Sequence, residues 1–184
     1  MVSPMPSLHA LLGNTDAFFA ELANGLADHG LPATLGPMDH LCYRAASNDE
    51  YISLKDGLSA HGQVLVEGMI GGRPIITYAL HRPLASPFGP VPCLELAAPK
   101  AGKRHSTGLE HGEIVVPSLT ALLETYPQVP FEQKGLPDEL TLSLPPLQVK
   151  FHRRSLADTI AHEITNGLVV PVPSGYFQRQ THKG

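Results

Sequence analysis

A chain of 184 residues is long enough for one domain or two small fused modules, and its 42% hydrophobic content supports a buried core rather than a disordered chain. Its 13 basic and 17 acidic residues form no block of like charge, and the net charge of -4 argues against a nucleic-acid or membrane partner. Two cysteines are too few for a disulfide scaffold, and we find neither a signal peptide nor an apolar run of about 20 residues. We therefore expect a cytoplasmic protein without a membrane span.

The first element expected in chain order is a helix. Asn14 or Thr15 can cap its start, and Gly30 ends it. Its apolar face consists of Phe18, Phe19, Leu22 and Leu26. We expect residues 1–37 to form an N-terminal helical extension that ends in a connector rich in proline and glycine.

Residues 38–98 have the pattern of a βαβββ module. The alternating segment 39–44 predicts a strand, and Ser47 with Glu50 forms the capping box of a helix. The pair Gly71-Gly72 suits a hairpin turn between two of the strands that follow. These three strands are expected at residues 63–69, 73–80 and 93–97.

Residues 108–152 repeat this order in weaker form. A strand over 111–116 precedes a helix that Ser118 caps. Short strands are then expected at residues 129–133, 140–144 and 147–152. Ser155 caps a further helix, and we expect residues 153–184 to form this helix and a flexible tail. Because a repeated unit is stronger evidence than any single element, we predict an α+β fold with paired βαβββ modules, a cupped mixed sheet, and extra N- and C-terminal helices.

Each of the principal predicted strands has one apolar face and one face with ionisable side chains, because side chains alternate along a strand. The ionisable face carries His40 on the first strand, Glu95 on the strand that ends the first module, and His111 on the strand that begins the second. Two imidazoles and a carboxylate suit a divalent metal and leave coordination positions open for substrate or water. The alternative, common for a polar strand face, is simple exposure to solvent.

Five segments give the chain a resemblance to a known family. They are Asp39-His40, Glu67 to Ile75, Leu94-Glu95-Leu96, Glu110 to Val115, and Val149 to His152. On these segments the chain resembles the YecM family, a bacterial group within the vicinal-oxygen-chelate superfamily of glyoxalase I, bleomycin-resistance proteins and extradiol dioxygenases. The resemblance runs from about Met38 to Glu163, and its specific parts are the second segment and the Glu-His-x-Glu strand.

The resemblance implies a ligand set. The superfamily takes a histidine from the first strand of each module and a glutamate from the last strand of the first module, which implies His40, His111 and Glu95 as metal ligands. The metal would be a divalent ion such as Zn, Fe, Ni, Co or Mn.

The last strand departs from the superfamily pattern. Glyoxalases and dioxygenases usually have a glutamate there, whereas the ionisable face of this strand offers Gln148, Lys150 and His152. We expect three protein ligands, with Lys150 outside the ligand set, paired with Glu113 or Glu95 or in contact with substrate. The alternative is that His152 is a fourth ligand.

Three further residues complete the expected site. Glu113 lies on the His111 face and is a candidate general base, or a carboxylate that orients a ligand imidazole. Arg44 and Arg73 are expected to orient an anionic substrate. For Arg73 the equal alternative is a turn arginine that pairs with a local acid.

These expectations together predict a metal-dependent enzyme of the vicinal-oxygen-chelate type, whose small anionic substrate presents two neighbouring oxygens to the metal. The chemistry stays open between a lyase, an isomerase and an Fe(II) dioxygenase. The alternative is a non-catalytic metal-binding or small-molecule-binding protein, similar to the bleomycin-resistance members. The expected partner is a small molecule, and the expected assembly is a monomer or homodimer.

Overall fold

The computed structural model describes residues 5–103, 106–134 and 138–180. Its helices are α1 (Leu8–Leu12), α2 (Thr15–Asp28), α3 (Asn48–Leu58), α4 (Leu119–Thr125), α5 (Leu156–Thr165) and α6 (Tyr176–Gln180). Its strands are β1 (Met38–Arg44), β2 (Gly62–Ile70), β3 (Arg73–Leu84), β4 (Val91–Ala97), β5 (Gly108–Val115), β6 (Glu139–Leu144) and β7 (Leu147–His152). The predicted α+β class and the mixed sheet are confirmed.

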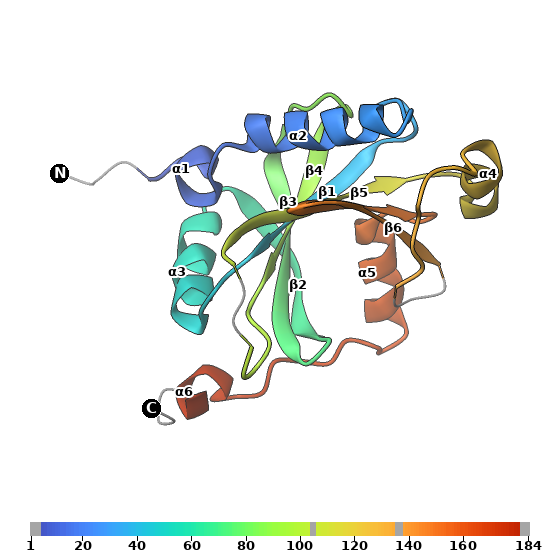
Figure 1. The fold of residues 1–184 in the computed structure, drawn as a ribbon. Helices are drawn as coiled ribbons and strands as arrows, with labels where there is room; N and C mark the ends of the chain where they lie inside the picture. The colour runs from blue at the N-terminus through green and yellow to red at the C-terminus, as the bar shows by residue number, and fades with distance from the viewer. Residues whose placement is uncertain (1–4, 104–105, 135–137, 181–184) are drawn as a thin grey trace.

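The strands form a single mixed sheet in the order β2-β3-β4-β1-β5-β7-β6 (Figure 1). In the first module β1 runs parallel to β4, and β3 and β2 continue the sheet in antiparallel fashion. In the second module β5 runs parallel to β7, and β6 follows antiparallel. The two modules join through the antiparallel β1–β5 pair at the centre of the sheet.

The central β1–β5 pair has a local twofold symmetry axis, as its register shows. Leu41 lies opposite Gly112, with the pair His40–Glu113 on one side of it and Cys42–His111 on the other. A twofold through the Leu41–Gly112 pair therefore exchanges His40 with His111 and Cys42 with Glu113. This relation places one histidine from each module at the middle of the sheet.

The apolar face of the sheet packs on helices α1, α2 and α3, which lie on the same side. The main core joins Phe19 and Leu22 of α2 and Tyr51 of α3 to strand residues such as Leu94 and Phe151. Helix α5 lies on the other side (Figure 1) and buries Ile160 outside this core. The ionisable face is thus covered in part by α5 and not by the core helices.

The C-terminal segment returns across the molecule after α5. The amide N–H of Met69 on β2 donates to the carbonyl of Val170 at 2.7 Å, and the ring of Phe177 stacks on Tyr51 of α3 at a centroid distance of 5.5 Å. The sequence predicted no regular element here, whereas the structure has the short helix α6. The aromatic stack explains how a segment rich in proline and glycine docks.

The second module has one strand fewer than predicted. The strand expected at 129–133 reduces to one bridge between Glu132 and Thr141, because Pro130 and the turns around it interrupt the ladder. The hairpin at Gly71 and Gly72 is confirmed, and both glycines have positive φ, at 59° and 83°. Such angles favour glycine and match the primed turn that joins tightly paired strands.

Candidate metal centre

His40, Glu95 and His111 converge on the ionisable face of the sheet. Cys42 of β1 lies between them in the register, opposite Glu95 on β4 and opposite His111 on β5. Each of the three residues offers a ligand atom, and these atoms all lie within 4.8 Å of one another. Both histidines are buried and Glu95 is partly buried, so the group is not a chance association on an open surface.

The spacing of these atoms is wider than that of ligands already bound to one divalent ion. Neighbouring ligand atoms at about 2.1 Å from a tetrahedral or octahedral ion lie about 3.0–3.4 Å apart. The observed upper limit of 4.8 Å therefore calls for a contraction of up to roughly 1.5 Å, which side-chain rotation can supply. The rings of His40 and His111 stand nearly perpendicular, at 77° with centroids 6.2 Å apart, so their edges can meet at a common point.

Each histidine is supported by the acidic residue that precedes it. The Nδ1 atom of His40 lies 3.0 Å from Asp39 Oδ2, and the Nδ1 atom of His111 lies 3.5 Å from Glu110 Oε1, longer than a well-formed hydrogen bond. Asp39 thus holds the Nδ1 atom of His40, whereas Glu110 lies near the Nδ1 atom of His111, which makes no hydrogen bond among the described residues. A carboxylate behind a ligand imidazole fixes the tautomer and raises its basicity.

Two β-bulges bring these carboxylates to the histidine side. The register shifts at Asp39 on β1 and at Glu110 on β5, which gives each strand one extra residue. An extra residue breaks strict alternation, so an acid and the histidine after it can face the same way. Asp39 was not among the predicted site residues, because strict alternation places it on the face opposite to that of His40. An acidic residue directly before a histidine occurs in the first strand of both modules, and this repeat is the sequence feature that indicates Asp39 and Glu110.

Asp39 also connects the site to α5. Its Oδ2 atom accepts a hydrogen bond of 2.6 Å from the amide N–H of Leu156, the first residue of that helix. The N-cap of α5 is Ser155, whose side chain accepts from Asp158 N. The negative carboxylate at the helix N-terminus is favourably placed with respect to the helix dipole.

The ionisation of His40 reflects the carboxylates around it. Burial disfavours the charged ring, but Glu113, the hydrogen bond to Asp39 and the charge of Glu95 outweigh it and raise the pKa of His40 to about 9. The His40 Nε2 atom lies 3.3 Å from Glu113 Oε2. In the metal-free protein the site therefore carries a proton that a cation would replace.

Glu113 belongs to a chain of ionic contacts on the second module. Its Oε1 atom lies 3.2 Å from His152 Nε2, and that nitrogen lies 3.4 Å from Glu139 Oε2. Glu139 also pairs with Lys150 at 3.1 Å. The partner of Lys150 is thus Glu139 and not the predicted Glu113 or Glu95, because β6 pairs with β7 and places Glu139 opposite His152.

The pKa values of this chain follow its contacts. Burial opposes ionisation of Glu139, but the hydrogen bond from His152 and the charge of Lys150 lower its pKa to about 2. The pKa of Lys150 is raised, because Glu139 outweighs the effect of burial. The pKa of His152 is also raised, by Glu139 and Glu113 against burial. Glu139 and Lys150 thus form an ionised pair beside the candidate metal site.

The local twofold explains where Lys150 stands. Glu95 lies opposite Cys42 on β1, and Lys150 lies opposite Glu113 on β5, so the exchange of Cys42 with Glu113 also exchanges Glu95 with Lys150. A threonine lies opposite each of them on the next strand, Thr77 beside Glu95 and Thr141 beside Lys150. A lysine therefore occupies the position that corresponds to the carboxylate ligand.

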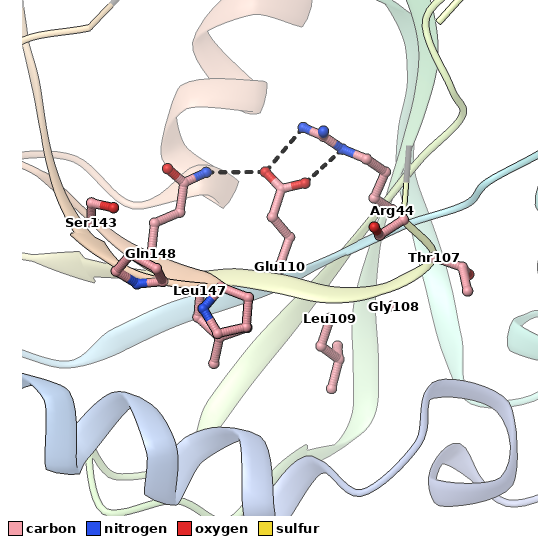
Figure 2. Close-up of a pocket in the computed structure, with 11 residues that line it drawn as sticks. Arg44, Thr107, Gly108, Leu109, Glu110, Ser143, Leu147 and Gln148 are labelled. Atoms are coloured by element: carbon pink, nitrogen blue, oxygen red, sulfur yellow. Dashed lines mark hydrogen bonds and ion pairs between the residues drawn. The ribbon is translucent and has the colours of Figure 1, made fainter. Parts of the chain in front are cut away.

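Arg44 lies at the far end of the same face and is already paired. Its guanidinium contacts Glu110 twice, Nε to Oε2 at 2.6 Å and Nη2 to Oε1 at 3.0 Å, and the Gln148 amide donates to Glu110 at 3.0 Å (Figure 2). Burial opposes ionisation of Glu110, but His111 and Arg44 lower its pKa to about 2. A cavity of about 630 Å³ opens beside these three side chains. A substrate anion that binds Arg44, as predicted, would have to compete with the Glu110 carboxylate for the guanidinium.

Arg73 differs from Arg44 in its contacts. Its Nε and Nη1 atoms are buried, and neither has a hydrogen-bond partner among the residues that the structure describes. It stands on the same face of β3 as Ile75 and Thr77, because alternate residues of a strand share a face. The alternative of a turn arginine with a local acidic partner finds no support in the described part of the chain.

The two cysteines are free and buried. Burial and the neighbouring Glu95 raise the pKa of Cys42 well above its ordinary value, and burial raises the pKa of Cys93 to about 11. Both are therefore neutral thiols at physiological pH.

A family model described as YecM protein matches residues 7–139 of the chain. This chain belongs to the YecM family. Protein YecM of Escherichia coli K12 is 31% identical over 121 residues, which is 66% of this chain and 61% of that relative. The matched part thus leaves more than a third of the relative outside the comparison.

The fold of this chain is similar to that of a solved protein. A solved structure described as structural-genomics protein EC4020 has a TM-score of 0.71 and 25% identity, and the match covers 89% of this chain and all of that one. A putative dioxygenase from Bacillus subtilis has a TM-score of 0.43 and 12% identity over 67% of this chain and 42% of its own. That second likeness is too loose to inform function. Within the described residues, no helix has the length and apolarity needed to cross a bilayer.

Proposed function

We propose that this chain is a metal-dependent enzyme of the vicinal-oxygen-chelate type, with His40, Glu95 and His111 as the protein ligands. The observation that carries the proposal is the pair of buried imidazoles, one from each module, each backed by its own carboxylate and both within ligand reach of Glu95. A buried group of this kind is costly to assemble unless a cation balances it.

Three protein ligands leave open coordination positions for a small molecule with two neighbouring oxygens. A bound divalent ion would stabilise negative charge that develops on those oxygens. Glu113 is the proposed general base, because its Oε2 atom lies 3.3 Å from His40 Nε2, next to the candidate ligands. Arg73 supplies positive charge for an anionic substrate, whereas Lys150 is held by Glu139, and a cytoplasmic location would give that substrate access.

The second candidate function is binding without turnover. The observation that favours it is the ionic environment of Glu113, which contacts both His40 and His152 and is thus less available as a base. The lysine at the position that corresponds to Glu95 also reduces the carboxylate count of the site. A metal-loaded protein that binds an oxygen chelator but converts no member of a panel of 2-oxo acids, hydroxy acids and catechols would support this candidate.

The test of the metal site is elemental analysis of protein purified without a histidine tag, followed by calorimetric titration with Zn(II), Mn(II), Co(II) and Ni(II). We expect one ion per chain. His111→Ala should abolish stoichiometric binding, and His81→Ala, which removes an exposed imidazole from β3, should leave it unchanged. Equal loss of the metal in both variants, or no binding by the unmodified chain, would sink the proposal.

A further inference from the structure

We infer that the ionisable face of the sheet binds a small carboxylic acid with an apolar chain. Its carboxylate pairs with Arg73, and its other end presents the chelating oxygens to the metal. The inference rests on the proposed function for the metal end of the ligand. The carboxylate end rests on Arg73 alone, so the two ends can be tested separately.

The buried nitrogens of Arg73 are the first observation. A guanidinium keeps its charge, and a buried N–H without an acceptor destabilises the folded chain. Arg73 has two such nitrogens, with no acceptor for either among the described residues. A bound carboxylate would satisfy both, since a guanidinium and a carboxylate match in a two-point pairing.

The other cations near the site are engaged. Arg44 is paired with Glu110 through two contacts, and Lys150 is paired with Glu139. A substrate anion at either position would compete with a carboxylate of the protein. Arg73 thus offers a charge that no described acidic group neutralises.

An apolar patch lies between Arg73 and the metal ligands. Cys42, Ile75 and Ala97 form a small buried cluster on this face, apart from the main core. Ile75 is the next residue of β3 on the Arg73 side, and Cys42 lies opposite Glu95. All three side chains are at most 5% exposed. An apolar chain that runs from the metal to the guanidinium would therefore pack against this cluster after displacing the residues that cover it.

The local twofold shows that this patch is specific to one module. Cys42 corresponds to Glu113, Ala97 to His152 and Ile75 to Glu139, as the pairings of the two modules show. Apolar groups in the first module thus stand where charged groups stand in the second. This asymmetry fixes the direction of an amphipathic ligand, with its chain over the first module.

The strand spacing sets the length of the ligand. Arg73 lies four residues before Thr77, the partner of Glu95, which is about 13 Å along β3. The arginine side chain covers part of that distance. The carboxylate must therefore be separated from the chelating oxygens by several carbon atoms.

The test uses three hydroxamates, which chelate metals through two neighbouring oxygens. Acetohydroxamate probes the metal end alone, octanohydroxamate adds an apolar chain, and the monohydroxamate of octanedioic acid replaces the terminal methyl of that chain with a carboxylate. Titration into the metal-loaded protein should show that the terminal carboxylate tightens binding at least about tenfold.

The variants isolate Arg73. Arg73→Met should remove the gain from the carboxylate, while the affinity for acetohydroxamate and for the metal stays unchanged. Arg82→Met, an exposed arginine on the same strand, should keep the gain. Arg73→Met should also unfold at the same or a higher temperature without ligand, because it removes two buried unpaired nitrogens, whereas loss of a structural arginine would lower it.

A carboxylate that brings no gain, or a gain that survives in Arg73→Met, would overturn the inference and leave the proposed function standing. A chain that binds no metal would overturn the proposed function. In that case octanoate still tests whether Arg73 binds a carboxylate in the metal-free protein. Octanoate should raise the melting temperature of the unmodified chain but not that of Arg73→Met.

Discussion

His152 and Lys150 have different positions in the charge pattern of the second module. His152 lies between the carboxylates of Glu113 and Glu139, and Lys150 pairs with the other oxygen of Glu139. Both side chains are thus satisfied by carboxylates and are not directed at the metal as free donors. The contacts favour three protein ligands over four.

This arrangement predicts how the metal responds to changes at the two residues. His152→Ala and Lys150→Met should both retain one ion per chain. Lys150→Met should bind the ion severalfold more tightly, because it removes a cation near a divalent charge. Calorimetric titration with Zn(II) measures both effects. A large loss of metal from His152→Ala alone would instead assign His152 as a fourth ligand.

Residue type and strand alternation were enough to select His40, Glu95 and His111, because alternation predicts that each lies on the ionisable face of its strand. They could not select Glu139. That glutamate lies on a strand that the sequence analysis began one residue later, and its closeness to Lys150 depends on the β6–β7 register. Register is set by turns and packing between strands, which a single segment does not contain.

The two bulges are the elements that define the candidate centre. Asp39 and Glu110 are related by the local twofold, and each extra residue turns a carboxylate toward the Nδ1 atom of the next histidine. Strict alternation would have placed these acids on the core face, where an unpaired carboxylate is costly. A bulge cannot be read from apolar periodicity, which is why the sequence analysis missed this arrangement.

The bulge carboxylates should control metal affinity without being ligands. Asp39→Ala and Glu110→Ala should each weaken Zn(II) binding about 10- to 100-fold, the usual cost of losing a carboxylate behind a ligand histidine. Asp39→Asn should lose less, because the amide oxygen still accepts from Nδ1–H. Competition against a chromogenic chelator measures the affinity.

The matched control is Glu132→Ala, which removes an exposed acid that pairs with Lys134 on the surface. It should not change the affinity. If Glu110→Ala also leaves it unchanged, the 3.5 Å separation from His111 is not bridged in the metal-bound protein, and support of the two histidines is not symmetric.

At the scale of the whole molecule, the repeated order of elements predicted a mixed sheet. The structure joins the two modules into one sheet through the central β1–β5 pair. The C-terminal segment was less predictable. Its proline and glycine content suggested flexibility, whereas Phe177 stacks on Tyr51 and Val170 pairs with Met69. Composition does not reveal such docking, because it depends on where α3 and β2 lie in space.

The whole molecule should have opposite pH responses with and without metal. In the metal-free protein the pKa of His40 is raised from 6.5 to about 9, so its contribution to stability is complete below pH 6.5 and is lost as the pH rises through 9. That contribution is on the order of 3 kcal/mol. The pKa values of Glu110 and Glu139 are lowered to about 2, so their contributions are present above pH 4.5 and are lost as the pH falls through 2. The metal-free protein should therefore be most stable between pH 4.5 and 6.5.

Metal binding requires neutral His40 and must displace its proton, so the stabilisation by the ion should grow as the pH rises from 6.5 to 9. Urea unfolding with EDTA and with excess Zn(II), across pH 4 to 9, gives both curves. The difference between them should widen on the alkaline side, and it should vanish in His111→Ala, which keeps the raised pKa of His40 but lacks a ligand. A metal-free protein that is more stable at pH 9 than at pH 6 would show that His40 is neutral in the folded state, and that the carboxylates around it do not hold a proton in place of the metal.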